Sequence, residues 1–517
     1  MKTSEQSDRR DEARTAGRGL IYIAGAKAFF IVTSFSIYLV LPRLLGTPAA
    51  YGLYSKAMSF GSIINNVLIA STVLSVSKFV SERDTDWKAV LRQGLTLQLG
   101  VGTALALAVF LFAPQIGERL LRDPTVTPLL RTIAAVIFCY ALYGALVGAL
   151  NGRRRFLHQA GLDATFSTFR TGGILAGAAI GVSIGSAFGP YGAITGFSIA
   201  ASLIVIAAFV VVGPGSSGET LPWRTWLGFM APIWLYQACL NGILLSDVLV
   251  MAGVLAQLGE AAGLSAPDAA EQASSYVGYY SAAQKFAFVP YQLMLSMTFI
   301  VFPMVARATS TGDQEAAQRT IREALRFSVL VLVGVATPIA GAADGVMRIA
   351  YPEEYLAGSG ALQVLVFGAA AFALFVISAT VISGAARPLI AAAIAAVGLV
   401  VVIGGNVVLV RLVGIGENTV SAAALGTSSG MFVALFLSAV AVYRRFGTYL
   451  APLTVLRVGF AGAAGFGAAH VVPHGSRGLA ILALAVGTLA YALVLVVTRE
   501  LGRRDIDAAR QVLERRK

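Results

Sequence analysis

Six ionisable side chains lie inside long apolar stretches of this sequence, where a charge is costly. They are Lys27, Asp163, Arg170, Asp247, Lys285 and Asp344. Within a bilayer such groups usually face a cavity or a partner of opposite charge, and they commonly mark a substrate or ion pathway. The chemistry open to them is the binding of an anion such as phosphate by the cations, or the exchange of a coupling cation at the carboxylates.

Helical spacing places several of these residues on polar faces. Three such faces carry Lys27 with Ser34 and Tyr38, Asp163 with Ser167 and Arg170, and Ser281 with Lys285, Gln292 and Ser296. Further polar side chains within the apolar stretches are Asn65, Asn66, Gln98, Gln237, Asn241 and Asn406. Since lipid cannot satisfy such faces, we expect them to line an internal aqueous cavity.

Each polar group also has a simpler explanation. Lys27 and Lys285 could extend to the nearer membrane surface, and the Asn and Gln side chains could hydrogen-bond between helices. Asp163 could neutralise Arg170 as a structural pair. Asp247 and Lys285 lie at similar depth, so they could pair with each other or serve ion coupling, whereas Asp344 lies close to the outer surface.

The stretches that carry these residues define the fold class. Of the 517 residues, 57% are hydrophobic and 13% charged, about half the charged share of a soluble domain. Apolar runs of about 20 residues recur, each long enough to span a bilayer. We predict an all-α polytopic membrane protein. Its fourteen spans are 20–41, 56–80, 90–113, 130–151, 159–184, 190–213, 227–252, 277–303, 325–349, 361–383, 387–411, 419–442, 453–473 and 477–498.

The distribution of positive charge predicts the orientation. With an even number of spans both termini lie on one side, and 28 of the 39 Lys and Arg residues fall on that side, against 8 on the other. Cytoplasmic loops are enriched in these residues, so both termini are expected to be cytoplasmic. The same rule explains the net charge of +13 without nucleic acid. It also explains the cluster at Arg153, Arg154 and Arg155, which could in addition attract an anionic lipid headgroup.

No metal site, disulfide or catalytic group is expected. Cys139 and Cys239 lie within apolar spans, and the three histidines have no ligand spacing. The polar segment at about 252–276 is expected to be an outer loop. It shows no nucleophile–base pair, so an enzyme is disfavoured. Pro232, Pro290, Pro303 and Pro338 should kink or end the helices that contain them.

An internal repeat divides the chain. "YGLYSKAMSF" (51–60) matches "VGYYSAAQKF" (277–286), and "LNGRRR" (150–155) matches "ISGAAR" (382–387). These matches begin the second span and end the fourth span of each half. We expect an N-terminal tail (1–19), two six-helix lobes (20–213 and 227–442) related by an axis along the membrane normal, a helix pair (453–498) and a C-terminal tail (499–517). Transporters of this design bind substrate between their lobes and alternate access.

The shared G-x-Y-S-x-A and G-x-x-R patterns, on two six-helix lobes, resemble those of the polysaccharide flippases. These are the Wzx-like O-antigen and exopolysaccharide translocases of the multidrug/oligosaccharidyl-lipid/polysaccharide (MOP) exporter superfamily. The resemblance covers about 20–442. Its relatives with fourteen spans include the lipid II flippase, whose last two helices form a groove for a lipid tail. The cavity of this chain has fewer arginines than that relative.

The resemblance implies a non-enzymatic flippase of the bacterial inner membrane that moves undecaprenyl-pyrophosphate-linked oligosaccharide to the periplasmic leaflet. It implies membrane lipids and envelope-assembly proteins such as a polysaccharide polymerase as partners, no cofactor, and coupling to a proton or sodium gradient. By helix and depth, Lys27 and Lys285 would contact the pyrophosphate, with Arg170 as a further cation. The alternatives are a cation-coupled multidrug exporter of the same superfamily and a lipid II flippase. The glycan, coupling ion and oligomeric state are left open.

Overall fold

The structure of the protein, a computed structural model, describes residues 25–26, 28–82, 86–310, 313–385, 387–473 and 475–502. The side chains of 296–300, 302–303 and 310 are not among those described, and the predicted site residue Lys27 lies outside the described residues. Regular elements within these ranges are all helical, as predicted. Twelve helices are long and apolar enough to cross a membrane, and the protein is a multi-pass membrane protein.

The chain forms two compact units, Met1–Gly278 and Tyr279–Lys517. The first unit contains the span Ala28–Leu45, α2 (Pro48–Glu82), α3 (Trp87–Gln115), the π-helix η2 (Ile116–Leu120), α4 (Val126–Gly152), α5 (Phe156–Ile184), the 3₁₀ helix η3 (Ser186–Phe188), α6 (Gly189–Val212), α7 (Trp223–Ala261) and the first part of α8 (Ala266–Ala287). The second contains α9 (Val289–Ser310), α10 (Gln314–Gly341), α11 (Ala343–Ala350), the 3₁₀ helix η4 (Glu353–Gly358), α12 (Ser359–Gly384), α13 (Pro388–Val413), α14 (Thr419–Phe446), α15 (Pro452–Val471) and α16 (Arg477–Val497).

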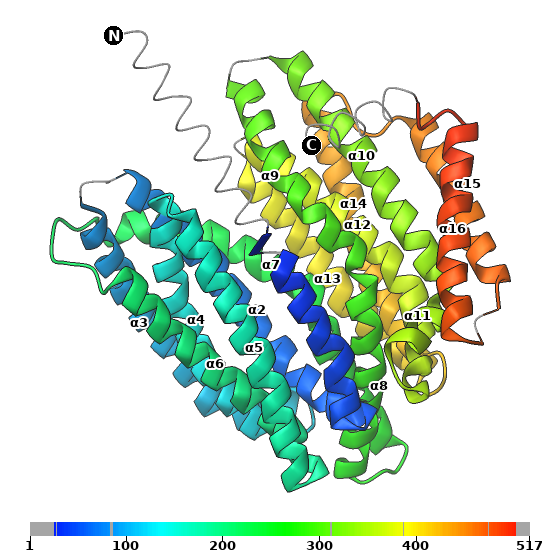
Figure 1. The fold of residues 1–517 in the computed structure, drawn as a ribbon, viewed down its shortest axis with the longest axis horizontal. Coiled ribbons are helices and arrows are strands. Elements are labelled where there is room, and N and C mark those ends of the chain that lie inside the picture. The colour runs from blue at the N-terminus through cyan, green and yellow to red at the C-terminus, as the bar shows by residue number, and fades with distance from the viewer. Residues whose placement is uncertain are drawn as a thin grey trace. The chain divides into compact units, whose positions relative to one another are not determined.

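The two units repeat one pattern of helix pairing. In the first, α4 packs against α2, α3 and α6, and α5 lies along α6 (Figure 1). In the second, α12 packs against α9, α10 and α14, and α13 lies along α14. The fourth span of each half, α4 and α12, is therefore its central helix. The helix α7 packs on α2 within the first unit, whereas the repeat assigns its sequence to the second half, so the predicted lobe boundaries stay a prediction.

The α5–α6 pair is held by direct contact between the two backbones. A Cβ added at Gly173 would lie 2.4 Å from the carbonyl oxygen of Gly196, and one added at Gly177 would lie 2.1 Å from that of Gly192. Only a residue without a side chain permits such an approach. Without a hydrophobic driving force between helices in lipid, close packing of this kind is a main source of association.

The glycines of the repeated motif also mark a close contact. A Cβ at Gly52 would lie 1.8 Å from the carbonyl oxygen of Ser274, and a Cβ at Gly278 would lie 2.1 Å from that of Pro48. In the alignment of the two halves, Ser274 corresponds to Pro48, so the two contacts are equivalent. The motif glycines therefore let the starts of α2 and α8 approach each other inside the first unit.

The segment 252–276, predicted to be an outer loop, is largely helical and not irregular; its side of the membrane stays a prediction. The helix α7 continues to Ala261, and α8 begins at Ala266 after a short turn. The backbone N–H of Asp268 donates to the Ser265 hydroxyl, which in turn donates to the Asp268 carboxylate. This Ser-x-x-Asp arrangement is a variant of the capping box that begins a helix, and its polar composition concealed it.

Two predicted spans are interrupted. The span 277–303 includes the end of α8 and the start of α9, with a break at Phe288 two residues before Pro290, as the proline predicted. The span 325–349 ends as one helix at Gly341, shortly after Pro338, and α11 follows separately. Pro232 lies within a continuous α7, where the kink predicted for it is compatible with an unbroken helix.

Replacement of Gly173 by Leu should force α5 and α6 apart. We expect a marked loss of monodisperse protein and a Tm lower by several degrees, because the side chain meets the Gly196 carbonyl. Gly172→Leu is a matched control on the same helix, since no atom lies within 4 Å of a Cβ built there. Equal melting temperatures for the two variants in detergent would show that the close contact is unimportant.

Candidate functional site

The clearest candidate site in the first unit surrounds Arg170 of α5. Arg170 is the fifteenth residue of this 29-residue helix, so it lies about 21 Å along the helix from its start. Its side chain is half-buried. One Nη donates a hydrogen bond of 3.3 Å to the Ser34 hydroxyl of the first span. The guanidinium also lies 4.8 Å from the centroid of the Phe30 ring, which is cation–π distance.

Contacts between the first span and α5 fix the position of Arg170. The hydroxyls of Thr33 and Ser167 hydrogen-bond to each other. The Thr171 hydroxyl donates to the Thr33 carbonyl oxygen at 3.4 Å. The polar faces predicted for these two spans, with Ser34 on one and Ser167 and Arg170 on the other, therefore meet inside the unit.

Arg170 has no carboxylate partner within the described residues. No Asp or Glu side chain there lies within 4 Å of its guanidinium. Its Nε is buried without a hydrogen-bond partner among the described atoms. A cation in this setting keeps the capacity to bind an anion.

Asp163, predicted as a partner of Arg170, accepts a hydrogen bond of 3.1 Å from the Tyr143 hydroxyl of α4. Arg170 instead donates to Ser34. The predicted ion pair is not among the contacts of the described residues, and the coupling role proposed for Asp163 stays a prediction.

One pair of amide side chains bridges two helices in the first unit. Asn66 of α2 donates to Asn241 of α7 at 2.8 Å, and Asn241 donates to the Gln237 carbonyl oxygen at 2.8 Å. Asn65 and Gln98 are buried, and their side-chain oxygens have no hydrogen-bond partner among the described atoms. The structure therefore gives Asn66 and Asn241 the role of a bridge between helices.

The remaining predicted site residues fall on both units. Asp247 is fully buried in α7, and its carboxylate accepts from the backbone N–H of Val248. Lys285 is half-buried in α8 within the second unit, and Gln292 follows in α9. Ser296 lies in α9, and its side chain is not described. The predicted Asp247–Lys285 pair stays a prediction.

The arginine cluster 153–155 forms the connection between α4 and α5. The Arg153 guanidinium lies 5.3 Å from the Trp87 ring centroid, and Arg154 has a φ of 54°, an uncommon left-handed conformation for a non-glycine residue. Asp344, predicted near a surface, is in the first turn of α11. No group of three or more His, Cys, Asp or Glu residues that could hold a metal ion occurs in the described part of the chain.

The sequence analysis missed a buried ion pair. Lys56 Nζ of α2 lies 2.6 Å from Asp123 Oδ2, and the two side chains are 0% and 2% exposed. The other oxygen of Asp123 accepts from the backbone N–H of Thr125 at 3.0 Å and from its hydroxyl. The predicted span 56–80 begins at Lys56, whereas α2 begins at Pro48, so the sequence pattern puts Lys56 at a membrane surface and not inside a helix.

The second half joins the equivalent segments without charge. Ala282 corresponds to Lys56 in the repeat, and Tyr351, like Asp123, precedes a proline before the fourth span of its half. The Tyr351 hydroxyl donates to the Ala282 carbonyl oxygen at 3.4 Å. Both halves thus tie the second span to the segment before the fourth, which indicates a structural role for the Lys56–Asp123 pair.

A second charged cluster fastens the last helices. Glu500, 4% exposed, pairs with Arg326 of α10 at 2.9 Å and with Arg457 of α15 at 3.1 Å, and it accepts from the Thr454 hydroxyl at 3.0 Å. Burial alone raises the pKa of Glu500, but the hydrogen bonds from Arg326, Arg457 and Thr454 outweigh it and hold the pKa below its usual value. The Glu500 cluster therefore joins α10, α15 and the end of α16.

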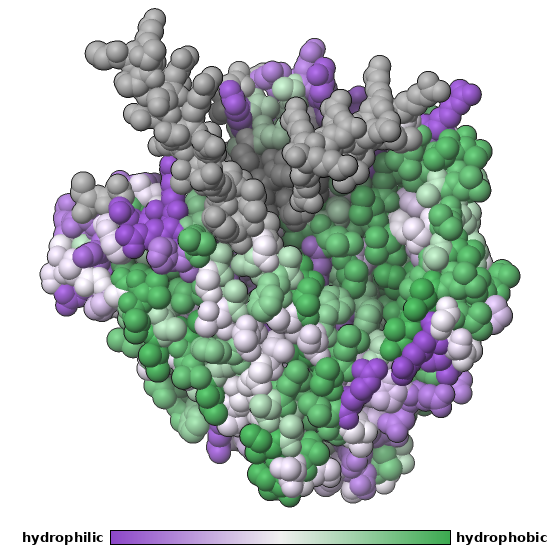
Figure 2. Space-filling model, in the orientation of Figure 1, coloured by the Kyte–Doolittle hydropathy of each residue, from purple (hydrophilic) through white to green (hydrophobic). Residues whose placement is uncertain are grey.

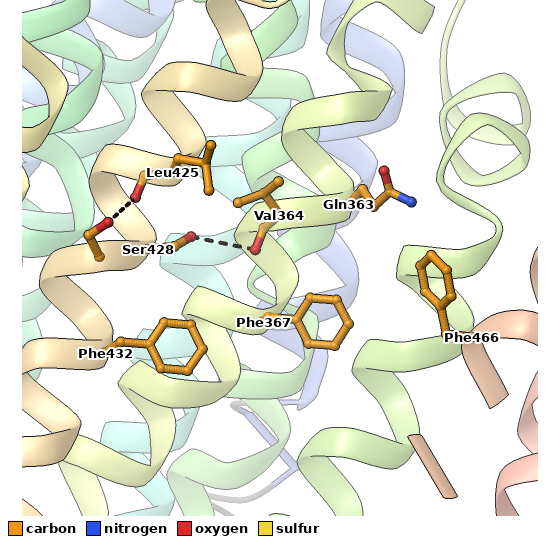
Figure 3. A pocket seen from close by; sticks show the side chains of 8 residues that line it. Gln363, Val364, Phe367, Leu425, Ser428, Phe432 and Phe466 are labelled. Atoms are coloured by element: carbon orange, nitrogen blue, oxygen red, sulfur yellow. Dashed lines mark hydrogen bonds between the residues drawn. The ribbon is translucent and has the colours of Figure 1, made fainter. Parts of the chain in front are cut away.

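The second unit has an apolar groove of about 540 Å³ along α12, α14 and α15 (Figure 3). Its lining residues are Gln363, Val364, Phe367, Leu425, Ser428, Ser429, Phe432 and Phe466. Ser428 and Ser429 donate to backbone carbonyl oxygens of α12 and α14, so their hydroxyls are already engaged. The groove presents aromatic and aliphatic surface to a ligand, which suits a hydrocarbon chain.

The outer surfaces of α15 and α16 are also apolar. Large hydrophobic side chains such as Phe460, Val471 and Leu489 are 69–82% exposed, and Figure 2 shows apolar residues over this part of the chain. Such exposure is expected of helices that face lipid.

No protein-family model matches the chain, and no curated protein sequence matches it. Solved structures do match. The lipid II flippase MurJ in an inward closed conformation aligns with a TM-score of 0.71 at 14% identity, over 93% of this chain and 99% of that one. The chain has the fold of the MOP transporters. That fold also occurs in a multidrug resistance MATE family transporter in an inward-facing conformation, with a TM-score of 0.61, 14% identity, and coverage of 81% of this chain and 94% of that one.

A MOP superfamily transporter from Pyrococcus furiosus, whose binding pocket is described as having reverse polarity, gives a TM-score of 0.59 at 14% identity, over 83% of this chain and 95% of that one. At these identities the likeness shows the fold and not the substrate. The predicted fold is confirmed, and the neighbours are transporters and flippases.

Loss of one partner of the Lys56–Asp123 pair should destabilise the first unit strongly. Lys56→Met leaves a buried carboxylate unpaired, so we expect a loss of about 3–5 kcal/mol in unfolding free energy and a lower Tm in detergent. Replacing both residues, as Lys56→Met with Asp123→Leu, should recover most of it. The control is Lys78→Met, since Lys78 pairs with Glu82 in an exposed site at 3.9 Å and should cost less than about 1 kcal/mol.

Glu500→Gln should loosen α15 and α16 at neutral pH. Because the folded pKa of Glu500 is lowered, its carboxylate stabilises the fold above about pH 4.3, and this contribution is lost as pH falls through the folded value. The protection factors of the α15 and α16 amides against hydrogen exchange, which are corrected for the intrinsic slowing of exchange in acid, should therefore fall in acid in the wild type. In Glu500→Gln these protection factors should be low already at neutral pH. Identical pH profiles for both proteins would contradict this role.

Proposed function

We propose that this protein is a flippase that moves an undecaprenyl-pyrophosphate-linked oligosaccharide from the cytoplasmic to the periplasmic leaflet by alternating access. The observation that carries the proposal is Arg170, a half-buried cation in the middle of a helix of the first unit, without a carboxylate partner among the described residues. We place the protein in the bacterial inner membrane with both termini cytoplasmic, following the distribution of Lys and Arg.

Arg170 is suited to bind the pyrophosphate, which is the part of this substrate that is most costly to move into hydrocarbon. A pyrophosphate carries two or more negative charges, and it cannot cross about 30 Å of hydrocarbon unaided. A guanidinium binds phosphate through up to two parallel hydrogen bonds, and the Nε of Arg170 has no protein partner in the described structure. We assign the pyrophosphate to Arg170, with Lys27 and Lys285 as the further cations that the sequence analysis proposed.

The polyprenyl chain needs an apolar surface of its own. The groove along α12, α14 and α15 supplies one, with Phe367, Phe432 and Phe466 on its walls (Figure 3). α15 and α16 are the helices that a lipid-linked substrate would use by analogy with the lipid II flippase. The MATE transporter and the Pyrococcus furiosus protein cover 81% and 83% of this chain, whereas MurJ covers 93%.

A lipid II flippase is the second candidate. The TM-score of 0.71 to MurJ, with 99% of that chain covered, favours it, and its substrate would also be a polyprenyl pyrophosphate. A multidrug exporter of the same superfamily has the same fold, but a site for organic cations would be expected to be acidic, and the Arg170 site is cationic. Coupling to a proton or sodium gradient is part of the proposal, with Asp163 and Asp247 as candidate groups.

The test is transbilayer movement of labelled undecaprenyl-pyrophosphate oligosaccharide in proteoliposomes with and without an imposed ion gradient. We expect Arg170→Gln to slow movement at least tenfold with an unchanged Tm, because one charge-assisted phosphate contact is lost. Lys285→Gln should act in the same direction. Arg131→Gln is the matched control, since Arg131 is exposed on α4 and lies 5.4 Å from the Phe110 ring centroid.

Lipid II in the same vesicles separates the two flippase candidates. Protein-dependent movement of lipid II but of no other glycan would favour the second. Full activity in Arg170→Gln would contradict the assignment of the pyrophosphate. Protein-dependent export of organic cations, with neither lipid moved, would overturn the flippase proposal.

A further inference from the structure

A second groove lies on the other side of α14, between α13 and α14 of the second unit. Its volume is about 660 Å³, and it is separate from the groove of Figure 3, with which it shares no lining residue. Leu389, Val397 and Leu437 are among its walls. The small side chains of Ala393 and Ala441 leave room between the two helices.

One end of this groove is strongly cationic. Arg387, immediately before α13, and Arg444 and Arg445, in the last turn of α14, line the same groove as the apolar residues. All three side chains are exposed, and no Asp or Glu within the described residues lies within 4 Å of them.

The internal repeat sets this cluster apart. Arg387 has a counterpart in Arg155 of the first half. The last turn of α6, which corresponds to that of α14, contains no basic residue, whereas the last turn of α14 contains two. The paired arginines therefore belong to this groove and are not part of the repeated framework.

We propose that this groove binds an anionic phospholipid of the cytoplasmic leaflet. The acyl chain lies along the walls formed by α13 and α14, and the phosphate contacts Arg387, Arg444 and Arg445. The distribution of charge favours this occupant, because the walls contain no polar group while the three cations are at one end. A soluble anion would leave the apolar walls empty, and a zwitterionic lipid would bring no net negative charge to the three cations.

The lipid is separate from the proposed substrate, so its test does not require transport. Purified protein in detergent is titrated with phosphatidylglycerol or phosphatidylcholine, and retained lipid is counted by native mass spectrometry. We expect one phosphatidylglycerol to be retained in preference to phosphatidylcholine. Arg444→Gln with Arg445→Gln should lower this affinity roughly 30-fold, since each arginine near an anionic lipid contributes about a factor of five.

Two further variants separate charge from shape. Lys88→Gln with Arg319→Gln removes the same charge from exposed positions outside the groove, and it should bind phosphatidylglycerol as the wild type does. Ala441→Phe keeps every arginine and fills the space between the walls, so it should also weaken binding. This variant tests the groove even if the double arginine variant fails to fold.

Three results would overturn the proposal. The first is equal retention of phosphatidylglycerol and phosphatidylcholine by the wild type. The second is unchanged binding in both Ala441→Phe and the Arg444/Arg445 variant. The third comes from competition: undecaprenyl pyrophosphate would displace bound phosphatidylglycerol at a lower concentration than added phosphatidylglycerol does. That result would make the lipid-linked substrate the occupant of the groove.

Discussion

Hydrocarbon offers neither hydrogen bonds nor counter-charges, and the polar arrangements within the described residues follow from that constraint. Lys56 and Asp123 are both buried, and each neutralises the charge of the other. The Asn66 side chain donates a hydrogen bond to Asn241 on a neighbouring helix. Arg170 differs from these groups because its described contacts are a serine hydroxyl and an aromatic ring. A charge with so little compensation is retained most readily where it contributes to a function, and this distinguishes Arg170 from the structural polar groups.

Small residues set the distances between helices. The glycines of α5 and α6 bring two backbones together, and Gly52 and Gly278 do so for α2 and α8. The second copy of the G-x-Y-S-x-A motif contains Gly278 together with Tyr280, Ser281 and Ala283. The last three residues are 0–1% exposed. Since these are packing residues, the motif indicates how helices pack and says little about the substrate. Solved structures of similar fold include a lipid II flippase and a multidrug resistance transporter, so this fold is not tied to one substrate.

Much of the fold could be predicted from the sequence because a membrane span is a local property. Apolar runs gave the helices, and Pro290 gave the break between α8 and α9. The misses were of two kinds. The start of α8 depended on a cap at Ser265 within a polar segment. The Lys56–Asp123 pair joins residues 67 positions apart, and no periodicity relates them. The sequence also could not show that Arg170 has no carboxylate nearby among the described residues, because this depends on which helices pack around it. Its polar face with Ser167 could be predicted from helical spacing.

In each half, one contact ties the second span to the segment before the fourth, and the two contacts should respond differently to heating. The Lys56–Asp123 pair is a desolvated ion pair, and the Tyr351 hydroxyl with the Ala282 carbonyl is a neutral hydrogen bond of 3.4 Å. The free-energy cost of removing charges from water falls as temperature rises. On warming, the Lys56–Asp123 pair therefore becomes more stabilising relative to the Tyr351–Ala282 hydrogen bond. Although the two halves share one architecture, their equivalent contacts therefore weaken at different rates.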